Sequence, residues 1–166
     1  MFEKFIKLFS FILLFASAGC ASHSQMYAGR KLPLAEVSTL SGTGVSSGPL
    51  GYGYTTMQIL FVDNTETKRA NMIENSVELL PGRRKIEIGC YNVETYANAE
   101  FEFEFLAGHN YQIRFKEAEG RTGFNSLHLE SAWLHDTTID KPVLSINSWS
   151  DTKKSVFIMP TTIYIN

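Results

Sequence analysis

The clearest constraint on the fold is a stretch in which glutamate and phenylalanine alternate strictly, Glu100 to Phe105. Successive side chains of a β-strand point to opposite faces, so this pattern predicts a strand with its phenylalanines in the core and its glutamates in water. Carboxylates on one face of such a strand repeat about every 7 Å, too far apart to share a proton or a small cation. We therefore expect a solvated acidic face here, and neither a catalytic carboxylate pair nor a calcium site.

Shorter strand-like runs occur along the rest of the chain, separated by turn signals. The runs are residues 36–40, 57–62, 76–80, 85–91, 111–115, 127–130 and 142–146. Turn residues such as Asp63-Asn64 and Pro81-Gly82 recur about every 8 to 12 residues, which is typical of a β-sandwich. Hairpins are expected around Pro81-Gly82 and around residues 107–110. The sequence thus predicts an all-β fold, an antiparallel β-sandwich of about seven to nine strands.

Several segments interrupt this pattern. Residues 41–54 hold five glycines and little apolar surface, which predicts a loop within the domain whose Tyr52 and Tyr54 form a contact patch or begin the next strand. Residues 70–78 could form one short helix, and residues 150–154 a polar turn. The pattern leaves open whether Trp133 continues a strand or starts a helical turn. An exposed aromatic patch would be drawn from these tyrosines, Trp133 and Trp149.

The first twenty residues have the order of an export signal. Lys4 and Lys7 precede an apolar run over residues 8–16, and the small residues 17–19 precede Cys20. The run is shorter than the roughly 20 residues that span a bilayer, which favours a cleavable signal over a permanent anchor. An ordinary secretion signal with an incidental cysteine is the alternative interpretation.

The motif Ser17-Ala18-Gly19-Cys20 resembles the lipobox of bacterial lipoproteins, with Ser17 where that family usually has leucine. The resemblance implies that the Cys20 thiol carries diacylglycerol, that the chain is cut before it, and that the new amino terminus is acylated. Two or three acyl chains hold a protein on a membrane essentially permanently. Residues 1–19 would then be the signal peptide, residues 20–30 a lipidated flexible spacer, and residues 31–166 the sandwich domain.

The same resemblance implies a location. Ala21 differs from the aspartate of an inner-membrane retention signal. We therefore expect an outer-membrane, lipid-anchored protein that faces the periplasm, or a protein on the outer face of the cytoplasmic membrane if the source has a single membrane.

Composition argues against nucleic acid as a partner and against a disulfide bond within the chain. Without residues 1–19 the chain keeps 13 basic and 16 acidic side chains, and this net charge of −3 argues against nucleic acid. With Cys20 lipidated, Cys90 has no partner for a disulfide within the chain. Cys90 shares a strand face with Ile86 and Ile88, which predicts a buried, inert thiol.

A second resemblance covers residues 57–115. Leu79-Leu80-Pro81-Gly82 followed by an alternating strand, and then Gly108 with residues 111–113, are similar to the PEGA-like β-sandwich pattern of bacterial surface and periplasmic lipoproteins. This resemblance implies a sandwich with a binding or scaffolding role, and it transfers no catalytic residue.

The sequence contains little that indicates a catalytic or metal-binding site. No Gly-x-Ser-x-Gly motif is present, and His109, His128 and His135 lie outside any catalytic or metal-binding motif. The basic cluster of residues 83–85 could touch anionic lipid or cell-wall polymer, but charges at a strand turn more often serve solubility. We expect no catalytic residue, no metal and no cofactor.

The predicted function is therefore that of a non-enzymatic lipoprotein, held in the membrane lipid by acylated Cys20, that binds or supports an envelope protein or cell-wall partner. One alternative is an envelope hydrolase or metal-handling protein that uses His109, His128, His135 and nearby carboxylates. Another is a purely structural surface lipoprotein.

Overall fold

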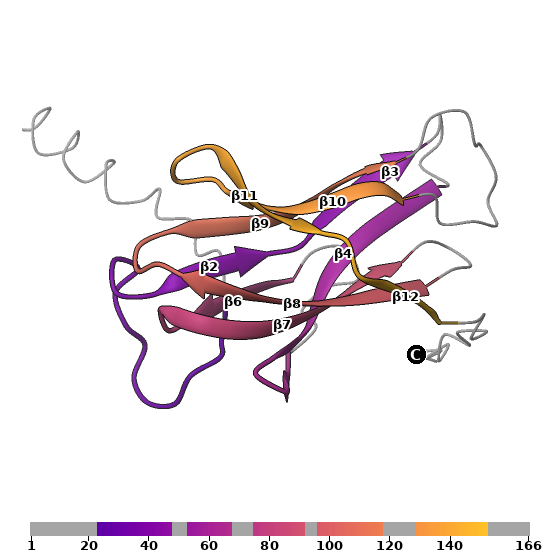
Figure 1. Ribbon diagram of the computed structural model, residues 1–166. Helices are drawn as coiled ribbons and strands as arrows, with labels where there is room; N and C mark the ends of the chain where they lie inside the picture. Colours follow the sequence, from indigo (N-terminus) through magenta and orange to yellow (C-terminus); the bar gives the residue numbers. More distant parts are fainter. Residues whose placement is uncertain (1–22, 48–52, 68–74, 92–95, 118–128, 153–166) are drawn as a thin grey trace, which may run out of the picture.

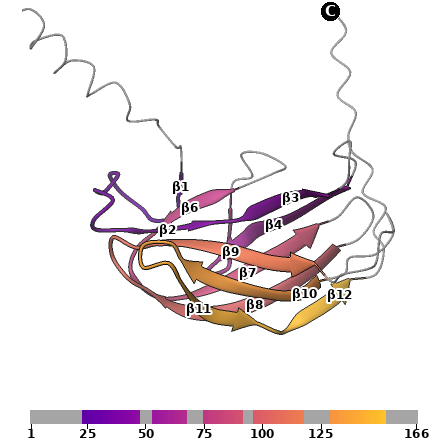
Figure 2. The ribbon, with the colours of Figure 1, turned by 90° about the horizontal axis from the view of Figure 1, so that it is seen from above.

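The structure, a computed structural model, describes residues 23–47, 53–67, 75–91, 96–117 and 129–152. These residues form two six-stranded sheets stacked as a sandwich, shown in two views in Figures 1 and 2. The described segments contain no helix, and so none that could cross a membrane. The strands are β1 (Ser24–Gln25), β2 (Ser38–Ser41), β3 (Thr43–Ser47), β4 (Gly53–Val62), β5 (Thr65–Glu66), β6 (Ser76–Leu79), β7 (Gly82–Tyr91), β8 (Tyr96–Phe105), β9 (Asn110–Glu117), β10 (Leu129–Asp136), β11 (Lys141–Ile146) and β12 (Trp149–Thr152).

Sheet A has the strand order β1-β6-β2-β9-β10-β11, and sheet B has the order β12-β8-β7-β4-β3 with β5 paired to β4. The all-β sandwich class is confirmed, but twelve strands replace the seven to nine expected. The predicted antiparallel arrangement is wrong in sheet A, where β1 pairs with β6 and β2 with β9 in parallel. Parallel pairs arise because the chain crosses between sheets, a step that hydrophobic alternation does not encode.

The core lies between the two sheets and takes side chains from both. Phe105 of sheet B packs edge-on against Tyr111 of sheet A, with ring centroids 5.0 Å apart, and Phe103 joins both rings. Glu100, Glu102 and Glu104 are exposed on the opposite face of β8, as the alternation predicts. The fully buried members also include Leu40, Met57, Ile59, Val77, Ile86, Ile88, Cys90, Ile113 and Leu134.

Both predicted hairpins are wrong, although their strands exist. Leu79 ends a strand of sheet A and Gly82 begins a strand of sheet B, so Pro81-Gly82 carries the chain from one layer to the other. The connection between β8 and β9 does the same in the reverse direction. Alternation fixes which face of a strand is buried, but it does not say which sheet the strand joins.

Residues 41–54 are not one loop, because β3 occupies residues 43–47 and pairs with the start of β4. Thr43 and Val45 are β-branched and favour an extended chain, which offsets the glycines around them. Likewise β12 replaces much of the polar turn expected at residues 150–154, and Trp133 continues strand β10. Residues 76–78 belong to β6, and a helix over residues 70–78 is therefore wrong in that part; residues 70–74 lie outside the described residues.

Residues 24–26 of the predicted spacer are ordered against sheet A. Ser24 and Gln25 pair with β6, and the Met26 amide donates to the Glu78 carbonyl at 3.0 Å. Met26 packs against the core, and apolar burial of this kind holds the segment in place. The signal peptide and Cys20 lie outside the described residues.

Candidate functional site

The outer face of sheet A carries a shallow depression of about 490 Å³ over strands β9, β10 and β11. Its position follows from the alternation of β10, in which Ala132, Leu134 and Asp136 point inward and leave Trp133 and His135 on the outer side. We call it the β9–β11 depression. It is lined by Arg114, Ser131, Ala132, Trp133, His135, Pro142, Ser145 and Asn147.

The strand register places residues of β9, β10 and β11 opposite one another across the depression, in rows that run from strand to strand. Trp133 lies opposite Arg114 on β9 and opposite Ser145 on β11. The next row places His135 between Gln112 and Pro142, after a register shift between β10 and β11. Irregular pairing of this kind often re-aims side chains near binding sites.

Two side chains of the depression carry donor groups that have no partner within the described part of the chain. Arg114 Nε donates to Gln112 Oε1 at 2.8 Å, while its terminal nitrogens make no further bond or ion pair there. The Trp133 indole N–H has no acceptor either, and it is not among the buried unsatisfied atoms, so solvent or a ligand can reach it. An arginine fork and an aromatic face together suit a ligand that presents an anionic group beside a ring or an apolar surface.

Arg114, which forms no ion pair with any described carboxylate, contrasts with the basic cluster noted in the sequence. Each member of that cluster pairs with a carboxylate at 2.7 to 3.0 Å: Arg83 with Glu102, Arg84 with Asp63, and Lys85 with Glu100. The hydrogen bond and charge of Glu100 also raise the pKa of Lys85. Residues 83–85 are therefore neutralised by their own neighbours, which agrees with a role in solubility.

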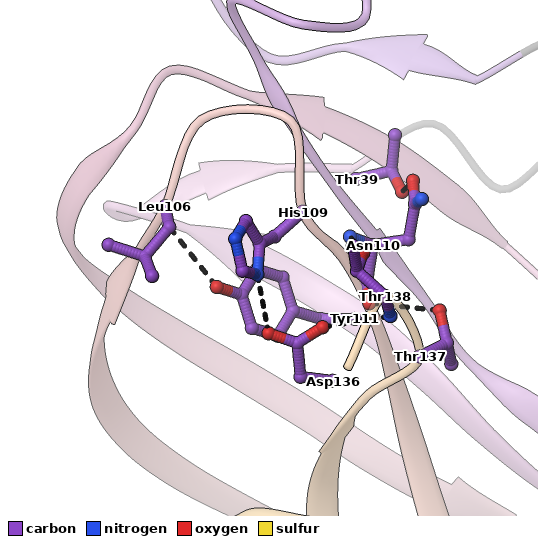
Figure 3. Close-up of polar contacts among 8 residues, drawn as sticks. All are labelled: Thr39, Leu106, His109, Asn110, Tyr111, Asp136, Thr137 and Thr138. Atoms are coloured by element: carbon purple, nitrogen blue, oxygen red, sulfur yellow. Dashed lines mark hydrogen bonds and ion pairs between the residues drawn. The ribbon is translucent and has the colours of Figure 1, made fainter. Parts of the chain in front are cut away.

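A second polar cluster lies where β8 turns into β9, drawn in Figure 3. His109 Nδ1 is 2.6 Å from Asp136 Oδ2, and the Asp136 side chain is only 3 % exposed. A carboxylate only accepts hydrogen bonds, so Nδ1 carries the proton of this pair. The other Asp136 oxygen accepts from the Thr138 amide at 2.9 Å, and the imidazole stacks on Tyr111.

This cluster looks like two parts of a hydrolase triad, but it lacks the third. Across the residues that the structure describes, no hydroxyl or thiol bonds to His109. The Tyr111 hydroxyl accepts from the Leu106 amide at 3.2 Å, and burial raises the pKa of Tyr111. The nearby threonines bond Asn110 instead, as Figure 3 shows. These hydrogen bonds are of the kind that fastens a loop, here the connection between β8 and β9.

The histidines named in the sequence do not converge. His135 Nε2 bonds Asp140 at 2.9 Å on the outer side of sheet A, whereas Asp136, one residue on, holds His109 on the inner side. His128 lies outside the described residues. Within the described ranges no group of three or more metal-ligating side chains comes together.

Cys90 is fully buried, and burial is the main cause that raises the pKa of its thiol to about 12. A thiol in this state is a poor nucleophile at neutral pH, as the alternation of its strand predicts.

Of the aromatic residues considered for a contact patch, only Trp133 lines the depression. The Trp149 indole donates to the Ile146 carbonyl at 3.1 Å, and the side chains of Tyr52 and Tyr54 are outside the described part. Arg114 was missed by sequence reasoning. Its signal is its outward position in the alternating run Tyr111 to Phe115, opposite an outward tryptophan.

No family model matches the chain, and no curated protein or solved structure is significantly similar to it.

Proposed function

We propose that this chain is a lipid-anchored envelope protein that works as a non-enzymatic binding module, with the β9–β11 depression as its binding surface. The observation that carries the proposal is that the terminal nitrogens of Arg114 and the indole N–H of Trp133, side by side on a sheet face, bond to no other described residue. Arginine and tryptophan are the residue types that most often dominate binding energy. Acylation of Cys20 would hold this surface in the outer membrane, on the periplasmic side, or outside the cytoplasmic membrane of a single-membrane cell.

The partner is a protein or cell-wall polymer of the envelope that presents a carboxylate or phosphate. A planar guanidinium binds such groups with two parallel hydrogen bonds, and the neighbouring indole covers the adjacent ring or apolar surface. Ser131, Ser145 and Asn147 also line the depression and offer further polar contacts.

Site-directed photocrosslinking in cells tests the binding surface. A benzophenone amino acid at Ser145, within the depression, should give a discrete crosslinked product, while the same group at Glu104, exposed on sheet B, should not. Arg114→Gln or Trp133→Ala should reduce that product at least tenfold, the effect of losing about 1.4 kcal/mol of binding free energy. Arg83→Gln is the matched control, because Arg83 is already paired with Glu102. Equal crosslinking from Ser145 and Glu104, or no product from either, contradicts the proposal.

Fractionation tests the anchor separately. Cys20→Ser should move the protein from the membrane pellet to the soluble fraction. A Cys20→Ser variant that stayed in the pellet and was still acylated would reject lipidation at this residue.

The alternative of a hydrolase or metal-handling protein draws on the His109–Asp136 pair. Elemental analysis of the purified protein discriminates between the two functions, because stoichiometric zinc or copper would favour the alternative. A purely structural lipoprotein would give neither a bound metal nor a crosslinked partner.

A further inference from the structure

The outer face of sheet A remains polar beyond the β9–β11 depression. Gln112 of β9 lies opposite His135 of β10. On its other side Gln112 is level with Ser41 of β2, which lies opposite Ser76 of β6. We call these four residues the polar row. The row crosses four neighbouring strands, seen in Figure 1, and three strand spacings make it about 14 Å long.

The polar row points away from the core. Each of its residues is next to a core residue of the same strand, and successive side chains of a strand alternate between the two faces. These core residues are Val77, Leu40, Tyr111 and Leu134. Ser76, Ser41 and Gln112 are half-buried, whereas His135 lines the depression. The row therefore begins in the depression and continues across the sheet.

Two residues of the polar row carry groups that bond no other described residue. Asp140 accepts a hydrogen bond from His135 Nε2 at 2.9 Å, so Nδ1 of the neutral ring is an acceptor. Gln112 Oε1 accepts from Arg114 Nε, and the amide nitrogen of Gln112 keeps both of its N–H groups. In the described part of the chain the one buried side-chain atom without a partner is Glu78 Oε1, so a ligand can reach both of these nitrogens.

The two serines extend the row with hydroxyl oxygens. The Ser41 hydroxyl donates to the Tyr111 carbonyl at 3.3 Å, and its oxygen can still accept a hydrogen bond. The Ser76 hydroxyl donates to the Leu40 carbonyl, also at 3.3 Å. From β10 to β2 the row thus presents an acceptor, then two donors, then an acceptor.

The polar row is bounded on both sides. Glu78 lies one outward position beyond Ser76 on β6, and it is covered by Tyr27 and Lys31 of the segment after β1. On the other side Arg114 and Trp133 form the next row along β9 and β10. A chain-like ligand that lies along the polar row therefore passes beside the guanidinium and the indole.

The groups of the polar row suit a ligand rich in hydroxyls. A protein partner usually buries an apolar centre, which the polar row lacks. Covering the Gln112 amide or the His135 ring nitrogen with a surface that offers no matching group would leave it unsatisfied, at a cost in binding free energy. A sugar hydroxyl both donates and accepts, so neighbouring hydroxyls of one sugar chain match the alternation of the row.

We propose that the ligand of the β9–β11 depression is an acidic oligosaccharide. Its charged sugar binds at Arg114 and Trp133, and its further sugars follow the polar row across β9, β2 and β6. The guanidinium takes the anionic group, carboxylate or phosphate, and the indole packs against the apolar face of the sugar ring. This inference rests on the proposed binding function and names the class of its ligand.

Calorimetric titration of the full-length protein in detergent tests the ligand class. The acidic probes are tetragalacturonate, a peptide-free tetrasaccharide of N-acetylglucosamine and N-acetylmuramic acid, and a deacylated phosphorylated lipopolysaccharide core. The first two have neutral counterparts of equal length, methyl-esterified tetragalacturonate and chitotetraose. We expect at least one acidic probe to bind ten times more tightly than its neutral counterpart or, for the phosphorylated core, than the same core after dephosphorylation. It should also bind ten times more tightly than its charged monosaccharide.

Variants separate the charged end from the polar row. Arg114→Gln should abolish the preference for the acidic probe, and Arg83→Gln, in an already paired arginine, should keep it. Ser41→Val should lower the ratio of oligosaccharide to monosaccharide affinity at least threefold, because Ser41 lies two strands away from Trp133. Ser76→Ala repeats this test on the next strand and guards against a single variant that fails to fold.

Equal affinity for acidic and neutral probes, or no binding of any acidic probe, would overturn the oligosaccharide proposal. Equal affinity for the oligosaccharide and its monosaccharide would overturn the role of the polar row. The crosslinked product from Ser145 reports the binding function by itself. A product that protease digestion shows to contain a second polypeptide, with no bound sugar, would reject the oligosaccharide and keep the binding surface. If neither a crosslinked product nor sugar binding is found, both proposals are rejected.

Discussion

The Lys31 ammonium lies 3.1 Å from Oε1 of Glu78, a carboxylate whose side chain is fully buried although it sits on the outer side of sheet A. The Lys31 side chain is 61 % exposed, and its direction of approach leaves Oε1 without a well-formed hydrogen bond. The contact is therefore mainly electrostatic. The other oxygen accepts from the Tyr27 hydroxyl at 3.3 Å, so the segment that follows the predicted anchor covers and neutralises this buried charge.

Replacing Lys31 should lower stability, because Lys31 compensates the buried charge of Glu78. Lys31→Met should lower the free energy of unfolding by about 1–2 kcal/mol, because it leaves a buried carboxylate without its cation. In a Glu78→Gln background the same change should have less than half that effect. Urea denaturation of the four proteins measures the coupling, and Lys141→Met, an exposed lysine that forms no ion pair with any described residue, serves as the control. A coupling energy indistinguishable from zero would mean that Lys31 does not compensate Glu78.

The two histidine–aspartate pairs should respond differently to loss of the carboxylate charge. Asp136 is 3 % exposed and bonds both His109 and the Thr138 amide, whereas Asp140 is 89 % exposed and, among the described residues, bonds His135 alone. Asp136→Asn should therefore cost about 1–2 kcal/mol of stability, and Asp140→Asn less than about 0.5 kcal/mol. Asparagine keeps the positive φ of 52° at position 140 accessible. Thermal unfolding of the two variants tests this order, and an equal loss in both would contradict it.

The sequence predicts where the strands lie better than it predicts which strands pair with each other. The alternation around Phe101 to Phe105 and around Ile86 to Cys90 identified the buried face of each strand, and burial bears this out. The pairing of β6 and β7 was predicted wrongly because Pro81-Gly82 suits a hairpin and a connection between two sheets equally well. Leu79 and Gly82 enter different sheets for reasons that involve the whole core.

The candidate site was only half visible in the sequence. The sequence singles out Trp133 as a possible patch residue, but the residues around it do not indicate whether it faces solvent. Arg114 lies in a strand without unusual features, and the sequence does not mark it as a binding residue. Their proximity depends on the register between β9 and β10, which is set by contacts far apart in sequence. The same limit explains the His109–Asp136 pair, whose members are separated by 27 positions.

Among the glycines whose surroundings the structure describes, Gly42 should tolerate a side chain least. It joins β2 of sheet A to β3 of sheet B, and a Cβ there would lie 2.0 Å from the Met57 carbonyl oxygen. Backbone cannot move aside as a flexible side chain can, so Gly42→Ala should cost about 3 kcal/mol or more. Gly82→Ala is the comparison, since that position has a φ of 115° but open space around it, and strain alone should cost about 1–2 kcal/mol. Chemical denaturation that ranked Gly82→Ala as the more harmful change would contradict the sheet-switching role of Gly42.

The buried thiol of Cys90 should make stability fall at alkaline pH. Burial raises its pKa from about 9.0 to about 12, so between these values the unfolded chain loses the proton while the folded chain keeps it. The stabilisation is complete below pH 9 and disappears as the pH rises toward 12, by an amount of the order of 4 kcal/mol. Cys90→Ala should therefore lose less stability than the wild type over this range, even though its small cavity lowers the free energy of unfolding at pH 7. Denaturation curves from pH 8 to 11 measure the difference, with the rate of thiol labelling as a second readout. Parallel pH profiles, or rapid labelling of the native protein at neutral pH, would show that the thiol is accessible and that its burial has been misjudged.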